Sequence, residues 1–176
     1  MNAHETFAHK SGEIHYIRIF KKEPMQPLNL PEYPIKTRIN EGGKTEVFDT
    51  IRKKYVVLQP EEWVRQQFIG FLIHHKNYPA SLIGIEKGLK VNQLQKRFDA
   101  VAFDKKGNPV VLIEFKAPSI KLTEKTFSQV AAYNLKMRVK YLIISNGLKH
   151  YCCKMDYENS SYQFLKDIPD YETIIE

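Results

Sequence analysis

The alternation of apolar and polar residues along the first third of the chain predicts short strands. Residues 35–40 and 45–50 flank a Glu-Gly-Gly-Lys segment in which glycine allows the positive φ angle of a tight turn, so they are expected to form a hairpin. Residues 54–58 are a further strand candidate. A weaker candidate spans residues 14–20 and leads to four prolines in eleven residues, which predict an extended connector.

Apolar residues recur at helical spacing in two later segments. The first opens with Gln59-Pro60-Glu61-Glu62, where proline occupies the first helical position and the acids lie near the positive end of the helix dipole. This helix should end near Asn77, and a second helix is predicted at residues 123–137. The face of the first helix that we expect to pack inward carries Trp63, Val64, Gln67, Phe68, Phe71, Leu72 and His75.

Strand candidates also lie between and after the two helices. Residues 96–103 alternate, whereas residues 109–116 and 140–145 are almost continuously apolar, as buried strands are. A short candidate at residues 82–87 precedes them, and a polar turn is expected at residues 104–108. The order of strands, helix, hairpin, helix and strand predicts an α/β or α+β fold with one mixed sheet flanked by helices.

The composition fits one globular domain and excludes several classes of protein. The chain has 176 residues, 43% of them apolar, but no apolar run reaches the ~18 to 20 residues that cross a bilayer. Met1 and the ten residues after it are polar, so we expect a cytoplasmic protein without a membrane partner. The only cysteines are the neighbours Cys152 and Cys153, which favours neither a disulfide framework nor a structural zinc site.

Charge is distributed unevenly along the sequence. The net charge is +7, yet residues 1–154 hold 26 bases against 14 acids, and residues 155–176 hold six acids and one base. A body this basic attracts polyanions, nucleic acid first among them, although a solvated surface can be basic for solubility alone. We expect an extension and Pro-rich connector at residues 1–32, a core at 33–154, and an acidic tail at 155–176 that packs on or trails the core.

An acidic pair within the central hairpin carries the candidate chemistry. A hairpin of residues 97–103 and 110–116 would bring Asp99 and Glu114 onto neighbouring strands, where two charges ~4 Å apart repel by about 4 kcal/mol at an effective dielectric near 20. A divalent cation would remove this penalty. Lys116 shares the face of Glu114, because side chains alternate along a strand.

Such a patch suits Mg²⁺, with Mn²⁺ as a substitute. Magnesium favours a few carboxylates, a main-chain carbonyl, here that of Phe115, and several waters, one of which can act as a nucleophile. The simpler alternative is that Glu114 and Lys116 form an ion pair on an edge strand and that Asp99 only caps a turn.

Several short strings of the sequence, including these acids and the lysine, resemble a known family. Asp99 with Glu114-Phe115-Lys116 is similar to the D…(D/E)-x-K signature of the PD-(D/E)-x-K nuclease superfamily. More narrowly, residues 33–151 resemble the N-terminal nuclease domain of type I restriction enzyme R (HsdR) subunits. The strings that carry this resemblance, in order, are Gln59-Pro60-Glu61-Glu62-Trp63-Val64-Arg65-Gln66, Lys96-Arg97-Phe98-Asp99, Ile113-Glu114-Phe115-Lys116-Ala117-Pro118, Gln129 to Asn134 and Ser145-Asn146-Gly147.

The resemblance implies a restriction-endonuclease-like core and a role for each matching residue. Asp99 and Glu114 would bind the metal, and Lys116 would orient the attacking water and stabilise the charge that grows on the phosphate. Glu62 would complete the metal site, although it could equally be a first-turn acid that interacts with the helix dipole. Gln129 and Tyr133 match a Q-x-x-x-Y element and would contact DNA or support Lys116; the alternative is a polar helix flank.

The expected function is therefore Mg²⁺-dependent hydrolysis of DNA phosphodiester bonds. The alternative is a DNA-binding or assembly module that keeps the fold but does not cleave. R subunits continue into a motor with a G-x-x-x-x-G-K-[ST] loop that this sequence lacks, so ATP hydrolysis is not expected. DNA, restriction-modification subunits or a motor protein, and a second copy of the chain are the expected partners. The candidates for DNA backbone contacts are Lys96, Arg97, Lys121, Lys125 and Lys136.

Overall fold

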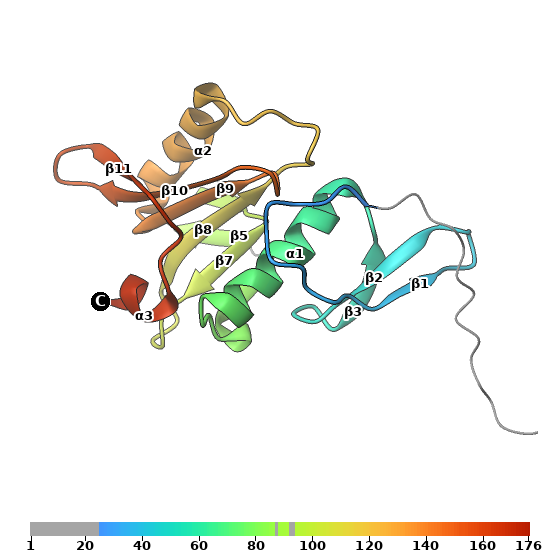
Figure 1. Ribbon diagram of the computed structural model, residues 1–176. Helices are drawn as coiled ribbons and strands as arrows, with labels where there is room; N and C mark the ends of the chain where they lie inside the picture. Colours follow the sequence, from blue (N-terminus) through green and yellow to red (C-terminus); the bar gives the residue numbers. More distant parts are fainter. Residues whose placement is uncertain (1–24, 87, 92–93) are drawn as a thin grey trace, which may run out of the picture.

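The computed structural model describes residues 25–86, 88–91 and 94–176, and within them the side chains of 88–91, 94–97, 124, 133 and 135–137 are not described (Figure 1). The strand candidate at residues 14–20 lies outside this part of the chain. The elements are β1 Thr37–Ile39, β2 Thr45–Asp49, β3 Lys54–Val57, α1 Pro60–His75, the 3₁₀ turn η1 Ala80–Leu82, β4 Ile83–Ile85, β5 Gly88–Val91, β6 Leu94–Arg97, β7 Ala100–Phe103, β8 Pro109–Phe115, α2 Glu124–Met137, β9 Tyr141–Ser145, β10 His150–Asp156, β11 Ser161–Leu165 and α3 Tyr171–Ile175.

A six-stranded mixed sheet with strand order β11-β10-β9-β8-β7-β4 organises the fold. Its pairs are antiparallel except β8 and β9, which run parallel and are joined by the crossover through α2. The predicted mixed sheet flanked by helices is confirmed. β1, β2 and β3 form a separate antiparallel sheet, and α1 lies between the two sheets (Figure 1).

Each face of the large sheet has its own apolar core. On one face Val64, Phe68 and Leu72 of α1 pack in a cluster that includes Ile113 and Ile143. On the other face α2 covers a second cluster, which contains Leu112, Leu142, Phe127 and Val130. The neighbours Cys152 and Cys153 are free and buried, and they lie in opposite clusters because side chains alternate along β10.

The interior of the sheet departs from the sequence prediction in one element. Residues 96–103 were expected as a single strand, but the structure divides them into β6 and β7, with Phe98 and Asp99 between them. β6 pairs with β5 in a small two-stranded sheet, and only β7 joins the large one. The break matters for the site, because it places Asp99 immediately before a strand and not within one.

The C-terminal residues belong to the folded body. β10 runs to Asp156, and β11 extends the sheet by pairing antiparallel with β10. α3 then returns to the core, where Tyr171 and Ile174 are buried and the Tyr171 hydroxyl donates to the carbonyl oxygen of Phe103. The segment expected as an acidic tail thus supplies a strand and a helix.

A connector ahead of β1 is held along α1. The amide of Gln67 accepts from the N–H of Tyr33 and donates to its carbonyl oxygen, both at 2.8 Å, as a neighbouring strand would. Trp63, expected in the core, instead is only partly buried and donates its indole N–H to the carbonyl of Gln26. Among the described helices none is both long and apolar enough to cross a membrane.

Candidate active site

Asp99 and Glu114 are brought together by the pairing of β7 with β8. Ala100 lies opposite Ile113, so one further step of the register sets Asp99 beside Glu114. The carboxylate of Asp99 accepts a hydrogen bond from the N–H of Phe115 at 2.7 Å. The register therefore brings Asp99, the residue before β7, next to Glu114 on β8, although Asp99 itself does not lie within a strand as the predicted hairpin had it.

Glu114 faces the α2 side of the large sheet. It lies two residues from Leu112, which belongs to the cluster beneath α2, and residues two apart in a strand share a face. Asp99 comes immediately before β7, so strand alternation does not fix its side; its hydrogen bond with the N–H of Phe115 places it where the apolar stretch of β8 ends. The patch therefore lies at this end of β8, within reach of charged side chains on α1.

Lys116 completes this patch. Its Nζ lies 2.8 Å from Oε1 of Glu114, and its backbone N–H donates to the carbonyl of Ser145 on β9. The simpler interpretation of the sequence predicted an ion pair between Glu114 and Lys116 on an edge strand. The ion pair is present, but β8 lies between β7 and β9, so the prediction of an edge strand is wrong. The lysine and glutamate side chains are 30% and 18% exposed, which leaves the pair accessible at the surface.

The electrostatics of the patch are those of crowded carboxylates. Burial raises the pKa of Asp99 above its usual value, and the negative charge of Glu114 raises it further, while the hydrogen bond from Phe115 opposes this. Burial by itself would lower the pKa of Lys116, but its bond to Glu114 and the nearby acids outweigh burial and raise it. Lys116 thus stays protonated beside acids that repel each other.

Glu61, rather than Glu62, is the acid of α1 that interacts with this patch. Burial raises the pKa of Glu61, and the charge of Asp99 raises it further, whereas the charges of Lys116 and Arg65 lower it. Adjacent helix positions point about 100° apart, so only one of the two glutamates can face the patch. The resemblance had assigned this role to Glu62.

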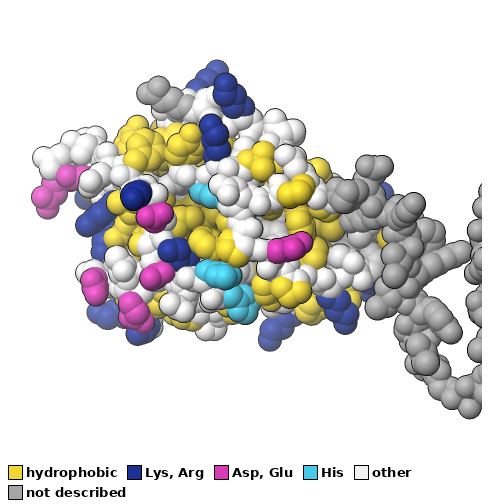
Figure 2. Space-filling view, in the orientation of Figure 1, with side chains coloured by type: hydrophobic (Ala, Val, Ile, Leu, Met, Phe, Trp, Pro, Cys, Tyr) yellow, Lys and Arg dark blue, Asp and Glu magenta, His cyan; other side chains and the backbone are white. Residues whose placement is uncertain are grey.

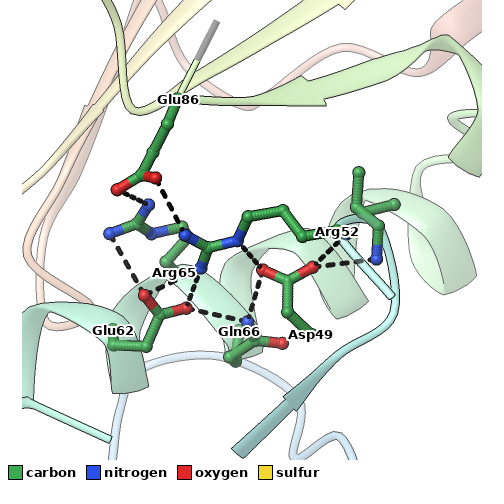
Figure 3. A network of polar contacts seen from close by, with 7 residues as sticks. Asp49, Arg52, Glu62, Arg65, Gln66 and Glu86 are labelled. Atoms are coloured by element: carbon green, nitrogen blue, oxygen red, sulfur yellow. Dashed lines mark hydrogen bonds and ion pairs between the residues drawn. The ribbon is translucent and has the colours of Figure 1, made fainter. Parts of the chain in front are cut away.

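Glu62 lies in a separate buried network (Figure 3). Its oxygens accept from Nη2 of Arg52 at 2.9 and 3.0 Å and from the amide of Gln66 at 2.8 Å, and one lies 3.3 Å from Nη2 of Arg65. Both carboxylate oxygens therefore have cationic partners within the protein. Neither interpretation of Glu62 from the sequence included this arrangement, because Asp49 and Arg52, which come from the β2–β3 turn, are distant in sequence.

The remaining predicted residues are less constrained. Gln129 is exposed on α2, and the side chain of Tyr133 lies outside the described residues. Lys121 and Lys125 are exposed at the start of α2, whereas nothing is described of the side chains of Lys96, Arg97 and Lys136. On the face seen in Figure 2, acidic and basic side chains of the described residues are interspersed.

The donors present fit a hard divalent cation. Among the described residues, no three acidic, histidine or cysteine side chains form a group that could hold a metal ion. Mg²⁺ does not need such a cage, because it usually binds one or two carboxylates and keeps waters or substrate phosphates as its other ligands. Asp99 and Glu114, with Glu61 and the carbonyl of Phe115 as further candidates, supply that kind of partial oxygen site.

Comparison with known proteins places the chain in a family. A family model described as the type I restriction enzyme R protein N terminus (HSDR_N) matches residues 60–169, which is more than half of the chain. The chain belongs to this family. The HSDR_N match runs from α1 to the residues after β11 and so includes Asp99, Glu114 and Lys116. It confirms the narrower resemblance drawn from the sequence.

Among solved structures, this HSDR_N chain is similar to the structure of a fragment assigned as an HsdR subunit of a type I restriction enzyme from Vibrio vulnificus YJ016. The two share 17% sequence identity with a TM-score of 0.49. The match covers 67% of this chain and 25% of the other chain, so this chain spans about a quarter of that protein's length. No curated protein matches the chain.

Proposed function

We propose that this HSDR_N chain is a Mg²⁺-dependent DNA endonuclease domain of the PD-(D/E)-x-K type. The observation that carries the proposal is the patch itself: Asp99, next to β7, accepts a hydrogen bond from the N–H of Phe115 beside Glu114 on β8, and the ammonium of Lys116 lies 2.8 Å from Glu114. Membership of the restriction enzyme R protein family supports DNA as the substrate.

In this proposal each residue of the site has a separate role. Asp99 and Glu114 hold the cation, with the Phe115 carbonyl and Glu61 as further oxygen ligands; Glu62, with its arginine partners, supports α1. The bound ion would polarise the scissile phosphate and lower the pKa of the attacking water. Lys116, which remains protonated, orients that water and offers a fixed positive charge where negative charge develops on the phosphate.

The DNA is proposed to approach the α2 side of the sheet. Lys121 and Lys125 are exposed there and would contact the phosphate backbone, which positions DNA without reading its sequence. Lys96, Arg97 and Lys136 are further candidates, and Gln129 and Tyr133 would contact DNA or support Lys116. ATP-driven movement along DNA would come from a motor protein or restriction-modification subunits. A second copy of the chain could cut the second DNA strand. The protein would act in the cytoplasm.

A plasmid-nicking assay tests the proposal. Purified protein is incubated with supercoiled DNA and Mg²⁺ or Mn²⁺, beside Asp99→Ala, Glu114→Gln and Lys116→Ala. Wild type should nick the plasmid, and each variant should lose at least about a hundredfold in rate. Lys105→Ala is a matched surface control, because this exposed lysine pairs with the equally exposed Glu172, and the variant should cut normally.

The non-cleaving module is the second candidate, favoured by the partial donor set of the site. It predicts DNA binding that weakens with salt and no nicking with either metal. Nicking that survives Asp99→Ala would instead point to a contaminating nuclease and contradict the assignment of the site.

A further inference from the structure

The arginine network consists of two cations and three acids packed between the β2–β3 turn, α1 and the segment after β4 (Figure 3). Arg52 is fully occupied in it: Nε lies 2.6 Å from Asp49, Nη2 lies 2.9 Å from Glu62, and Nη1 lies 3.1 Å from Glu86. These short contacts link three segments of the chain, so Arg52 stabilises the way these segments pack together. The members of the network are Asp49, Arg52, Glu62, Arg65, Gln66 and Glu86.

Arg65 differs from Arg52 in how it is bonded. Its side chain is only 7% exposed, and its contacts with Glu62 and Glu86 are long, at 3.3 and 3.5 Å. Its Nε and Nη1 atoms make no hydrogen bond to any described part of the chain. A buried donor without a hydrogen bond is costly. The internal bonds of the network therefore do not account for Arg65.

The candidate active site provides the missing reason. Arg65 follows Glu61 by four residues on α1, so the two side chains share a helix face. The charge of Arg65 favours the ionised forms of both Glu61 and Asp99. The network also reaches Asp99 directly, because the N–H of Glu86 donates to the carbonyl oxygen of Asp99 at 2.9 Å.

The charge balance shows what this cation can do. The patch holds three acids, Glu61, Asp99 and Glu114, against the single base Lys116. Before a metal binds, these acids repel each other across a partly buried site. Arg65, one helical turn from Glu61 and only 7% exposed, is a second positive charge that acts on these acids.

We infer that Arg65 is a positioning residue: a buried counter-ion that holds the acids of the patch together before the metal binds, and whose positive charge then opposes that metal. The inference rests on the proposed metal site. It has a consequence that a purely structural arginine lacks. Removing the charge should destabilise the metal-free protein and, at the same time, tighten the binding of a divalent cation.

The test measures metal affinity and stability separately, without cleavage. Mn²⁺ is titrated by calorimetry, and thermal unfolding is followed in EDTA and in saturating Mn²⁺, for wild type, Arg65→Met and Arg65→Lys. Arg65→Met should unfold at a lower temperature in EDTA, bind Mn²⁺ about tenfold more tightly, and gain more from Mn²⁺ than wild type does. Arg65→Lys, which keeps the charge, should behave like wild type in Mn²⁺ affinity.

Arg52→Met is the matched control. It removes the same charge from the same network, but Arg52 lies on the β2–β3 turn and does not share the helix face of Glu61, so it should lower the unfolding temperature equally with and without Mn²⁺. The inference is overturned if Arg65→Met follows that pattern, or if it binds Mn²⁺ no more tightly than wild type. If Arg65→Met does not fold in EDTA, Mn²⁺ must restore its folded circular dichroism spectrum, and failure to do so also overturns the inference.

The outcomes separate this inference from the function on which it rests. Wild type that neither binds nor is stabilised by Mn²⁺ refutes the metal site itself, and the role of Arg65 with it. Wild type that binds Mn²⁺, with affinity unchanged in Arg65→Met, refutes only the role of Arg65. Arg65→Gln serves as a second neutral variant, because its amide can still donate to Glu62 or Glu86.

Discussion

Replacing Gly147 by alanine should disturb the point where three elements meet behind the candidate active site. Gly147 follows β9, has φ +82°, and donates its N–H to the hydroxyl of Ser145. Its carbonyl accepts from the N–H of Asn29 in the connector. An added Cβ would lie 2.6 Å from a methyl carbon of Leu28 and 3.1 Å from one of Val64 on α1.

Two costs add at this position. Left-handed backbone costs a residue other than glycine about 1–2 kcal/mol. The contacts with Leu28 and Val64 require the connector or α1 to shift, and overpacking of this kind costs about 1–3 kcal/mol. We therefore expect Gly147→Ala to lower the free energy of unfolding by about 2–5 kcal/mol, the sum of the two terms.

Gly107 provides a control that isolates the second term. It has a similar φ of +85°, but a Cβ there meets nothing within 4 Å. Gly107→Ala should therefore cost only the backbone term, about 1–2 kcal/mol. Urea unfolding of both variants under one set of conditions measures the difference. If Gly147→Ala costs no more than Gly107→Ala, the close packing of the connector on this turn is refuted.

Three further predictions concern the site and its surroundings. Burial lowers the pKa of His150 below 6.5, so this histidine binds a proton more readily in the unfolded chain than in the folded protein. The free energy of unfolding should therefore fall as the pH drops below about 6.5. Urea titrations at several pH values should show a smaller fall for His150→Gln. Glu61→Gln should weaken Mn²⁺ binding, measured by calorimetry, with little change in stability. Glu62→Gln should lower the free energy of unfolding, measured in urea, by about 3 kcal/mol, because its arginine partners lose a buried carboxylate. The prediction is contradicted if the two variants show each other's effects. Replacing Lys121 and Lys125 by alanine should weaken DNA binding, measured by fluorescence anisotropy, equally for unrelated sequences. The slope of log K against log salt concentration should become less negative by up to about two. An unchanged slope would exclude both lysines as phosphate contacts.

Much of the central hairpin could be predicted because its pattern is local. The alternation before Asp104 and the apolar run before Glu114 define two strands around a polar turn, and a two-residue period then determines which side chains share a face. The meeting of Asp99 and Glu114 follows from that pairing alone. The helix-start signal at Pro60 likewise matches α1, and the helix predicted at residues 123–137 matches α2, whose N-cap Thr123 forms a capping box with Thr126.

Other features depend on contacts that no local pattern records. β11 was not predicted, although Tyr162 and Phe164 alternate with polar residues in it; it is exposed along most of its length and is held by pairing with β10. The separate environments of Glu61 and Glu62 depend on Arg52, which reaches Glu62 from the β2–β3 turn. Spacing along the helix does not distinguish the two glutamates, because Arg65 is four residues from Glu61 and three from Glu62.

The adjacent thiols of β10 offer a built-in reporter of how the protein opens. Burial raises the pKa of Cys152 and of Cys153 to about 12, so neither should react with an alkylating reagent while the protein stays folded. One thiol lies beneath α1 and the other beneath α2. Mass spectrometry after brief alkylation would therefore distinguish concerted opening, which gives doubly modified chains, from peeling of a single layer, which gives one modification at an identifiable sulfur.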